Sequence, residues 1–205
     1  AAAGARATRV VEGTGRAAER VAGRRFELDA AGFWQPHRDA AQRYSDLIAQ
    51  WAAAAPGATA VDLYSGVGVF AARLGEQVGR TGSVLGVESS TAAVADGAAA
   101  LADMPQVELR AARVEKTLAA LSDRPDVVVL DPPRAGAGRA VTDAVTAGGA
   151  GVIVHVGCDP AAFARDVGLY AARGYRLAEV RAFDAFPLTH HVECLGLLIR
   201  PDRVR

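Results

Sequence analysis

The sequence predicts an α/β protein built on a doubly wound, Rossmann-like sheet of seven mostly parallel strands, with an antiparallel C-terminal hairpin and a small N-terminal appendage. Two patterns predict this fold. From residue 58 onward, short apolar runs alternate with alanine-rich helical segments, as in sheets whose parallel strands are joined by crossover helices. The last two apolar runs are separated only by a loop over residues 184–190, so we expect them to pair antiparallel at a sheet edge.

The N-terminal region, residues 1–35, is expected to be a linker with a candidate β-hairpin, and residues 36–205 are expected to form the main domain. The first 25 residues carry six arginines against two glutamates and show little apolar periodicity. Such a stretch is either a solvated linker or a source of contacts to phosphate groups. The two candidate hairpin strands are residues 8–11 and 25–28.

The remaining elements follow from the spacing of apolar residues. A helix over residues 38–55 is predicted because Tyr44, Ile48 and Trp51 recur at helical spacing. Further helices are expected over residues 67–77, 90–102, 114–121, 138–147 and 160–173. The seven strands are expected near residues 59–64, 83–88, 107–111, 126–131, 151–157, 176–183 and 192–199.

Composition limits the class of protein. The 205 residues are 51% hydrophobic and 22% charged, which is typical of one well-packed domain. Two cysteines argue against a disulfide scaffold, a four-cysteine zinc site or any other metal site, and they fit a reducing cytoplasm. No apolar run is long enough to span a membrane, and the N-terminus lacks the apolar core of a signal peptide. The chain does not begin with methionine, so we expect further sequence upstream.

A ligand site is predicted where the first strand of the sheet meets its helix. Asp62 and Tyr64 lead into a turn containing Gly66 and Gly68, and Glu88 ends the next strand, where its carboxylate can accept hydrogen bonds from ribose hydroxyls. The spacing also fits a variant dinucleotide fingerprint, and the glycines could belong to a simple turn beside a solvated Glu88. Asp62 would repel a pyrophosphate but suits a cationic amino-acid ligand, which favours S-adenosylmethionine, with Tyr64 near its sulfonium or adenine.

Two segments further along carry chemistry. Asp131 ends a buried strand and is followed by two prolines and Arg134, a rigid lip that favours a polar or anionic neighbour, although a proline turn with a surface arginine has the same sequence. Cys158 lies between a strand and a helix that Asp159 and Pro160 should start, so exposed amides there favour its thiolate. Taken alone, Cys158 is more simply a small buried hydrophobe.

The start of the last strand adds two candidates. Period-two alternation places His191 and Glu193 on one face and Cys194 on the other. A lone glutamate at the start of an edge strand is more often solvated than catalytic, and Cys194 is most simply a core residue.

At this point the chain resembles the bacterial RNA uracil-5-methyltransferase family over residues 26–200, in motifs that follow the family's order. The motifs are an aromatic–glutamine pair ending at Gln35, the cofactor loop over residues 62–68, the acidic–proline segment over residues 131–134, the cysteine segment over residues 156–166 and the terminal base segment over residues 186–193.

The resemblance implies a class I methyltransferase fold that takes S-adenosylmethionine and forms 5-methyluridine in structured RNA, ribosomal or transfer. It further implies that Cys158 is the nucleophile and Glu193 the general base. Gln35 and Asp131 are expected to contact both cofactor and substrate, and Arg134 and His191 to contact the substrate. An RNA-binding domain upstream is expected. Two alternatives stay open: a cofactor-binding module without activity in this chain, and a methyltransferase that acts on another nucleobase.

Overall fold

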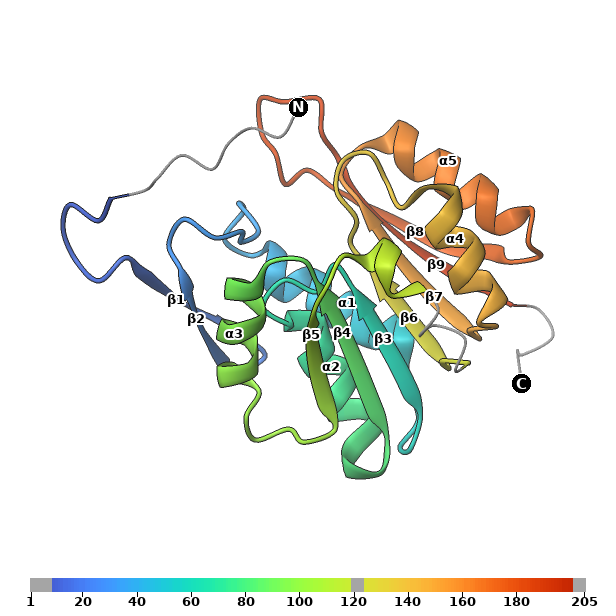
Figure 1. Ribbon diagram of the computed structural model, residues 1–205. Helices are drawn as coiled ribbons and strands as arrows, with labels where there is room; N and C mark the ends of the chain where they lie inside the picture. The colour runs from blue at the N-terminus through green and yellow to red at the C-terminus, as the bar shows by residue number, and fades with distance from the viewer. Residues whose placement is uncertain (1–8, 119–123, 201–205) are drawn as a thin grey trace.

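The computed structural model describes residues 9–118 and 124–200, which form a three-layer α/β domain with a small hairpin attached (Figure 1). The seven-stranded sheet has the order β5 (Val107–Ala111), β4 (Ser83–Glu88), β3 (Thr59–Leu63), β6 (Val127–Leu130), β7 (Val152–Gly157), β9 (Glu193–Ile199), β8 (Arg176–Phe183). The helices are α1 (Ala40–Ala52), α2 (Val69–Val78), α3 (Thr91–Ala100), α4 (Gly138–Ala147) and α5 (Pro160–Ala171), with 3₁₀ turns η1 (Gly79–Thr81) and η2 (Val114–Lys116).

The topology confirms the predicted doubly wound sheet. Strands β3 to β7 are parallel, and the strand order reverses between β3 and β6, where such folds bind ligands. Only β9 runs antiparallel, and it pairs with both β7 and β8. The predicted C-terminal hairpin is therefore present, with β8 at the sheet edge and β9 inside the sheet.

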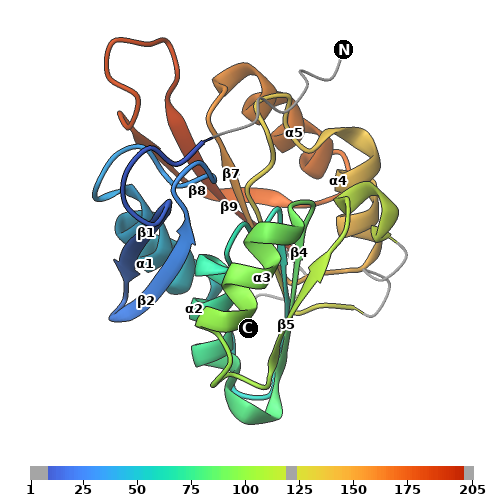
Figure 2. The ribbon, with the colours of Figure 1, turned by 60° about the vertical axis from the view of Figure 1, so that its left-hand side comes forward.

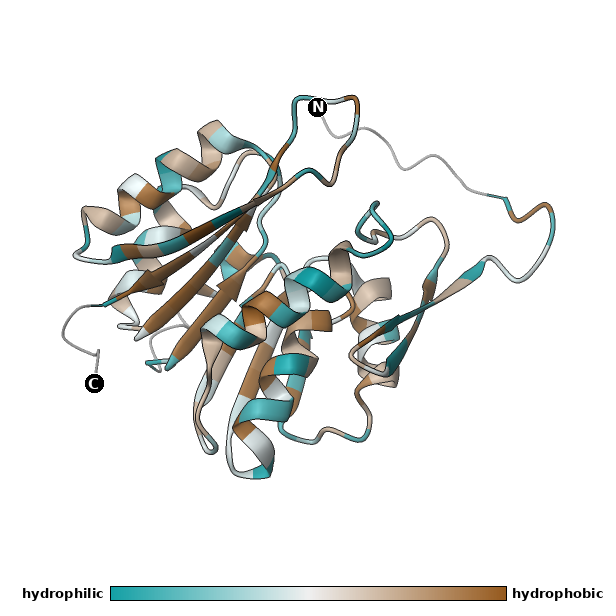
Figure 3. Ribbon diagram, turned by 180° about the vertical axis from the view of Figure 1, so that it is seen from behind, coloured by the Kyte–Doolittle hydropathy of each residue, from teal (hydrophilic) through white to brown (hydrophobic). Residues whose placement is uncertain are grey.

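Helices cover both faces of the sheet, with α1 and α2 on one side and α4 and α5 on the other (Figure 1). Strand β6 shows why. Val127 and Val129 pack on the α1 and α2 side, whereas Val128 and Leu130 pack on the α4 and α5 side, and all four are buried. A strand buried on both faces reads as a continuous apolar run, which is the pattern in the sequence and the brown band in Figure 3.

The N-terminal hairpin differs from its prediction in one strand. It pairs β1 (Arg16–Val21) with β2 (Arg24–Asp29), whereas residues 9–11 lie outside any strand and Thr8 lies outside the described residues. The hairpin lies beside α3 in Figures 1 and 2. Arg16 donates to Asp96 over 2.6 Å and Arg24 to Asp103 over 2.6 Å, so two arginines of the basic N-terminal stretch are already paired with α3 and the turn that follows it.

The predicted helix over residues 114–121 is present only as the 3₁₀ turn η2, and residues 119–123 lie outside the described residues. The other helices begin and end within three residues of their predicted bounds. Within the two described ranges, every helix is too short or too polar to cross a membrane.

Candidate active site

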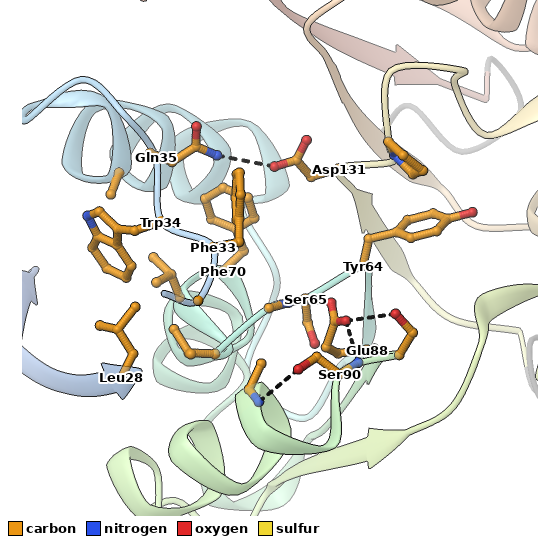
Figure 4. Close-up of a pocket in the computed structure, with 18 of the residues that line it drawn as sticks. Leu28, Phe33, Trp34, Gln35, Tyr64, Ser65, Phe70, Glu88, Ser90 and Asp131 are labelled. Carbon is orange, nitrogen blue, oxygen red and sulfur yellow. Dashed lines mark hydrogen bonds between the residues drawn. The ribbon is translucent and has the colours of Figure 1, made fainter. Parts of the chain in front are cut away.

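The carboxyl ends of the parallel strands open into a cleft of about 540 Å³. One wall comes from the segment that follows the hairpin, including Trp34 and Gln35, and the floor comes from the loop after β3 (Figure 4). The far end is formed by Cys158 after β7 and Glu193 at the start of β9. The volume suits a ligand of nucleoside size.

The glycine turn after β3 is held by Glu88. The amide of Gly66 donates to Glu88 Oε2 over 3.1 Å, and the amide of Ser90 donates to Glu88 Oε1 over 2.7 Å. Gly66 has a φ of +55° with no heavy atom within 4 Å of where a Cβ would be, so the backbone is open to a ligand there. The carboxylate stands at the end of the second strand, as predicted, and lines the cleft.

Three residues of the predicted cofactor set are placed differently from what the sequence suggested. Asp62 is fully buried beneath the turn, does not line the cleft, and accepts a hydrogen bond from the amide of Ala71 over 2.8 Å. Burial raises the pKa of Asp62 well above its ordinary value, and the carboxyl organises the first turn of α2 instead of lining the cleft.

Gly68 also lies off the cleft, at the start of α2 with a φ of +82°, and a Cβ there would come within 3.1 Å of Leu101. Tyr64 does line the cleft, but its ring points away from Trp34 and packs with the core on the α4 and α5 side (Figure 4). Burial raises the pKa of Tyr64 to about 12. That Tyr64 faces the sulfonium or adenine stays a prediction, which rests on its place in the lining of the cleft.

The charge of the cleft helps to decide between the two ligands that the sequence left open, a dinucleotide and S-adenosylmethionine. Carboxylates dominate its lining, namely Asp29, Glu88, Asp96, Asp131 and Glu193, against the single arginine Arg134. Such a lining disfavours a pyrophosphate and favours a ligand with a positive centre. Within the described residues, no group of three histidine, cysteine or carboxylate side chains could hold a metal ion.

The geometry at the far end of the cleft follows from the register of β7 and β9. Gly157 is paired with Cys194, so the next position outward on each strand brings Cys158 beside Glu193 with both side chains on one face. Asp159 caps α5 by accepting from the amide of Ala162 over 2.8 Å, and Pro160 is the first helical residue. The predicted strand-to-helix switch at Cys158 is confirmed.

The pKa of the Cys158 thiol does not follow the sequence prediction, which was that the thiolate is favoured. Burial, followed by the nearby carboxylates Glu193 and Asp131, raises the pKa of Cys158, although its own backbone amide and Arg134 act in the opposite direction. The helix terminus alone therefore does not favour the thiolate here. The carboxylates are perturbed too, because burial raises the pKa of Asp131 to about 7, and burial together with Asp131 raises that of Glu193 to about 8.

Glu193 is 3% exposed, so the solvated alternative for this glutamate is wrong. The side-chain amide of Gln35 donates to Asp131 over 3.3 Å (Figure 4), and Arg134 also lines the cleft. His191 does not line the cleft, and its ring lies 4.3 Å from that of His190. The structure thus brings together all the predicted substrate-side residues except His191.

A buried carboxylate outside the cleft fixes the lip that carries Arg134. Asp166 of α5 accepts from the amide of Ala137 over 2.7 Å and from the guanidinium of Arg165 over 2.8 Å, and Arg165 also donates to the carbonyl of Ala135 over 2.7 Å. The loop after β6 is thereby tied to the helix behind Cys158. Asp166 ends the cysteine segment of the family resemblance, but the sequence indicated no role for it, because only the folded structure brings it to the loop after β6.

The chain matches known proteins over most of its length. Residues 8–201 match the family described as tRNA (uracil-5-)-methyltransferase. An uncharacterised RNA methyltransferase of Corynebacterium diphtheriae is 43% identical over 203 residues, covering 95% of this chain and 48% of that protein. Another from Streptomyces coelicolor is 43% identical over 181 residues, covering 88% of this chain and 40% of that protein. The chain therefore spans about half the length of the relatives it matches.

Solved structures agree in fold. The tRNA (uracil-54, C5)-methyltransferase of Pyrococcus abyssi, in complex with S-adenosyl-L-homocysteine, matches with a TM-score of 0.76 at 29% identity, covering 92% of this chain and 45% of that chain. TYW2 of M. jannaschii, in complex with AdoMet, matches with a TM-score of 0.66 at 16% identity, covering 94% of this chain and 90% of that chain. The second likeness shows a shared fold alone.

Proposed function

This chain belongs to the tRNA (uracil-5-)-methyltransferase family, which confirms the resemblance seen in its motifs, and we propose that it methylates carbon 5 of a uridine in RNA. Members of this family are S-adenosylmethionine-dependent RNA methyltransferases. The observation that carries the proposal is that Cys158 and Glu193 together line the end of an acidic, nucleoside-sized cleft.

The residues of the cleft fit the cofactor. Glu88 offers carboxylate oxygens at the second strand, Gly66 offers an open backbone, and Trp34 offers an apolar wall. These groups would hold the ribose and adenine, and the surrounding carboxylates favour the sulfonium charge. When bound, the cofactor supplies the methyl group.

The chemistry of the protein begins at Cys158, because carbon 5 of uracil becomes nucleophilic only after an addition to carbon 6. The thiolate of Cys158 forms a bond to carbon 6, and the electron pair of the ring's double bond moves to carbon 5 and the adjacent carbonyl. After carbon 5 has taken the methyl group, Glu193 removes the remaining proton there. The carbon–sulfur bond then breaks, and the thiolate leaves with its electron pair.

The other polar residues orient the base. Gln35 and Asp131 are hydrogen-bonded to each other, and together with Arg134 they offer donors and acceptors for the polar edge of a uracil. The base has to leave its stack to enter this cleft. The RNA is a transfer or ribosomal RNA under this proposal, and an RNA-binding domain in the longer protein would complete the substrate surface.

The decisive experiment uses RNA that contains 5-fluorouracil together with S-adenosylmethionine. A base can remove a proton from carbon 5 but cannot remove fluorine, so the adduct between Cys158 and carbon 6 should be trapped. It should migrate as a protein–RNA band on a denaturing gel. Cys158→Ala should abolish the band. A protein that binds S-adenosylhomocysteine but forms no such adduct on any cellular RNA would contradict the proposal and favour an inactive binding module or another target base.

A further inference from the structure

A tyrosine outside the sequence motifs lies next to the candidate base. Tyr44 of α1 is 1% exposed, and its ring meets that of Phe183 edge-on with 5.1 Å between centroids. Phe183 of β8 is the register partner of Glu193 in β9. Since paired residues in a sheet point to the same face, the side chain of Glu193 extends toward the side of the sheet that Tyr44 covers.

Two oxygens on this face have no hydrogen-bond partner among the described residues, although both are buried. One is the hydroxyl of Tyr44 and the other is Oε1 of Glu193. A buried polar atom left unpaired is costly, so two such oxygens on the same face of the sheet point to a hydrogen bond that links them. The negative charges of Glu193, Asp131 and Cys158 all act on Tyr44 and, after burial, raise its pKa, so its hydroxyl stays protonated and able to donate.

We propose that the Tyr44 hydroxyl donates a hydrogen bond to the Glu193 carboxylate through one water molecule, and that it is a positioning residue which stabilises the charged form of Glu193 and directs it at carbon 5. This inference rests on the proposed function. It assigns no contact between Tyr44 and the substrate.

The surroundings of Glu193 explain why such a donor is needed. The titratable groups that face it are Asp131 after β6, Cys158 after β7, Cys194 beside it in β9 and Tyr44 on α1. Burial and Asp131 raise the pKa of Glu193 to about 8, so at neutral pH most of it is protonated and unable to accept a proton. A hydrogen bond to the charged form favours ionisation, and of the four groups the tyrosine is the strongest donor, because a thiol donates only weakly and Asp131 loses its proton near pH 7.

The proposed reaction has two stages, and only the second transfers a proton to Glu193. Addition of Cys158 to carbon 6 and methylation of carbon 5 do not use Glu193 as a base. The next stage does, since the carboxylate takes the proton of carbon 5, the electron pair of that bond forms the ring double bond, and the sulfur leaves. Loss of the Tyr44 hydroxyl should therefore slow release and leave capture intact.

The test is Tyr44→Phe, with Ser45→Ala as the matched control, because the Ser45 hydroxyl on the same helix is also buried and unpartnered. With 5-fluorouracil RNA, all three proteins should form the adduct at the same rate. With ordinary RNA at pH 7, Tyr44→Phe should turn over about tenfold more slowly than the wild type. The midpoint of the ascending limb of its pH–rate profile should move up by about one pH unit, so that raising the pH restores the rate.

Superimposable pH–rate profiles for Tyr44→Phe and the wild type would overturn the inference and leave the hydroxyl a spectator in the core. Equal losses of adduct formation and turnover, accompanied by a lower Tm, would overturn it as well, since they indicate a structural role. Failure of the wild-type protein to form any adduct is a different outcome, because it refutes the proposed function itself.

Discussion

The buried carboxyl of Glu193 should lower the free energy of unfolding of this protein at pH 7. Its carboxyl has an ordinary pKa of 4.5 and a folded-state pKa of about 8, so the folded form holds a proton that the unfolded chain releases above pH 4.5. The stabilising effect of a raised pKa is complete below the unfolded value and is lost as the pH rises through the folded one. The interval from the unfolded pKa to pH 7 is about 2.5 pH units. Over this interval the retained proton lowers the free energy of unfolding by about 1.4 kcal/mol for each unit.

Glu193→Gln removes that cost. The amide is also buried, which takes back part of the gain, so we expect the free energy of unfolding at pH 7 to rise by about 2 to 3 kcal/mol. For a chain of this size, such a change raises the Tm by roughly 4 to 12 °C. At pH 4.5 the contribution from ionisation shrinks to about 0.4 kcal/mol, because the unfolded carboxyl is then half protonated, so the cost of the buried amide leaves no net gain.

Differential scanning calorimetry at pH 4.5, 7 and 9 measures the effect, with Glu179→Gln as the control. Glu179 is an exposed residue of β8 that pairs with Arg181 over 3.0 Å, so its loss should change the Tm little at any pH. A Glu193→Gln variant that is no more stable than the wild type at pH 7, or equally more stable at pH 4.5, would refute the assignment of Glu193 as a neutral, strained carboxyl.

Two other substitutions test the frame of the site. Asp166→Ala should lower the free energy of unfolding by about 3 kcal/mol in urea titrations, because the amide of Ala137 and the guanidinium of Arg165 lose their buried acceptor; a loss below about 1 kcal/mol would contradict this. Gly97→Ala should weaken S-adenosylhomocysteine binding about tenfold by calorimetry, since a Cβ there would lie 2.6 Å from the carbonyl of Val67 in the cofactor loop. Gly168→Ala, whose Cβ would meet nothing within 4 Å, should bind like the wild type, and equal affinity in both variants would exclude a packing role for Gly97.

The sheet could be predicted because its strands are buried on both faces and joined by amphipathic helices. Val127–Leu130 has no polar residue to confuse the pattern, and the prediction for that strand differs from the structure by one residue at each end. The strand Arg16–Val21 was missed because its burial alternates weakly and two of its six residues are arginine. Its placement depends on α3, through the ion pair between Arg16 and Asp96, and the sequence of the strand does not encode that contact.

The site residues that could be predicted from the sequence are those that lie at the end of a strand. Cys158, Asp131 and Glu88 each follow an apolar run, so the rule that parallel strands end together brought them to one edge. Asp62 shows the limit of that rule. It lies one residue before the end of its strand, and its side chain therefore points into the core. Tyr44 was indistinguishable from any apolar residue of its helix, since only the contact of its ring with Phe183, the register partner of Glu193, places it near the candidate base.

Strand β9 is made last but lies inside the sheet, between β7 and β8. During synthesis, the nascent chain therefore holds Cys158 on β7 before the strand with Glu193 has left the ribosome. Under the proposed mechanism, such a chain has the thiol that captures an RNA but not the base that lets it go. The insertion of β9 thus determines when the thiol becomes part of a site that can release its substrate.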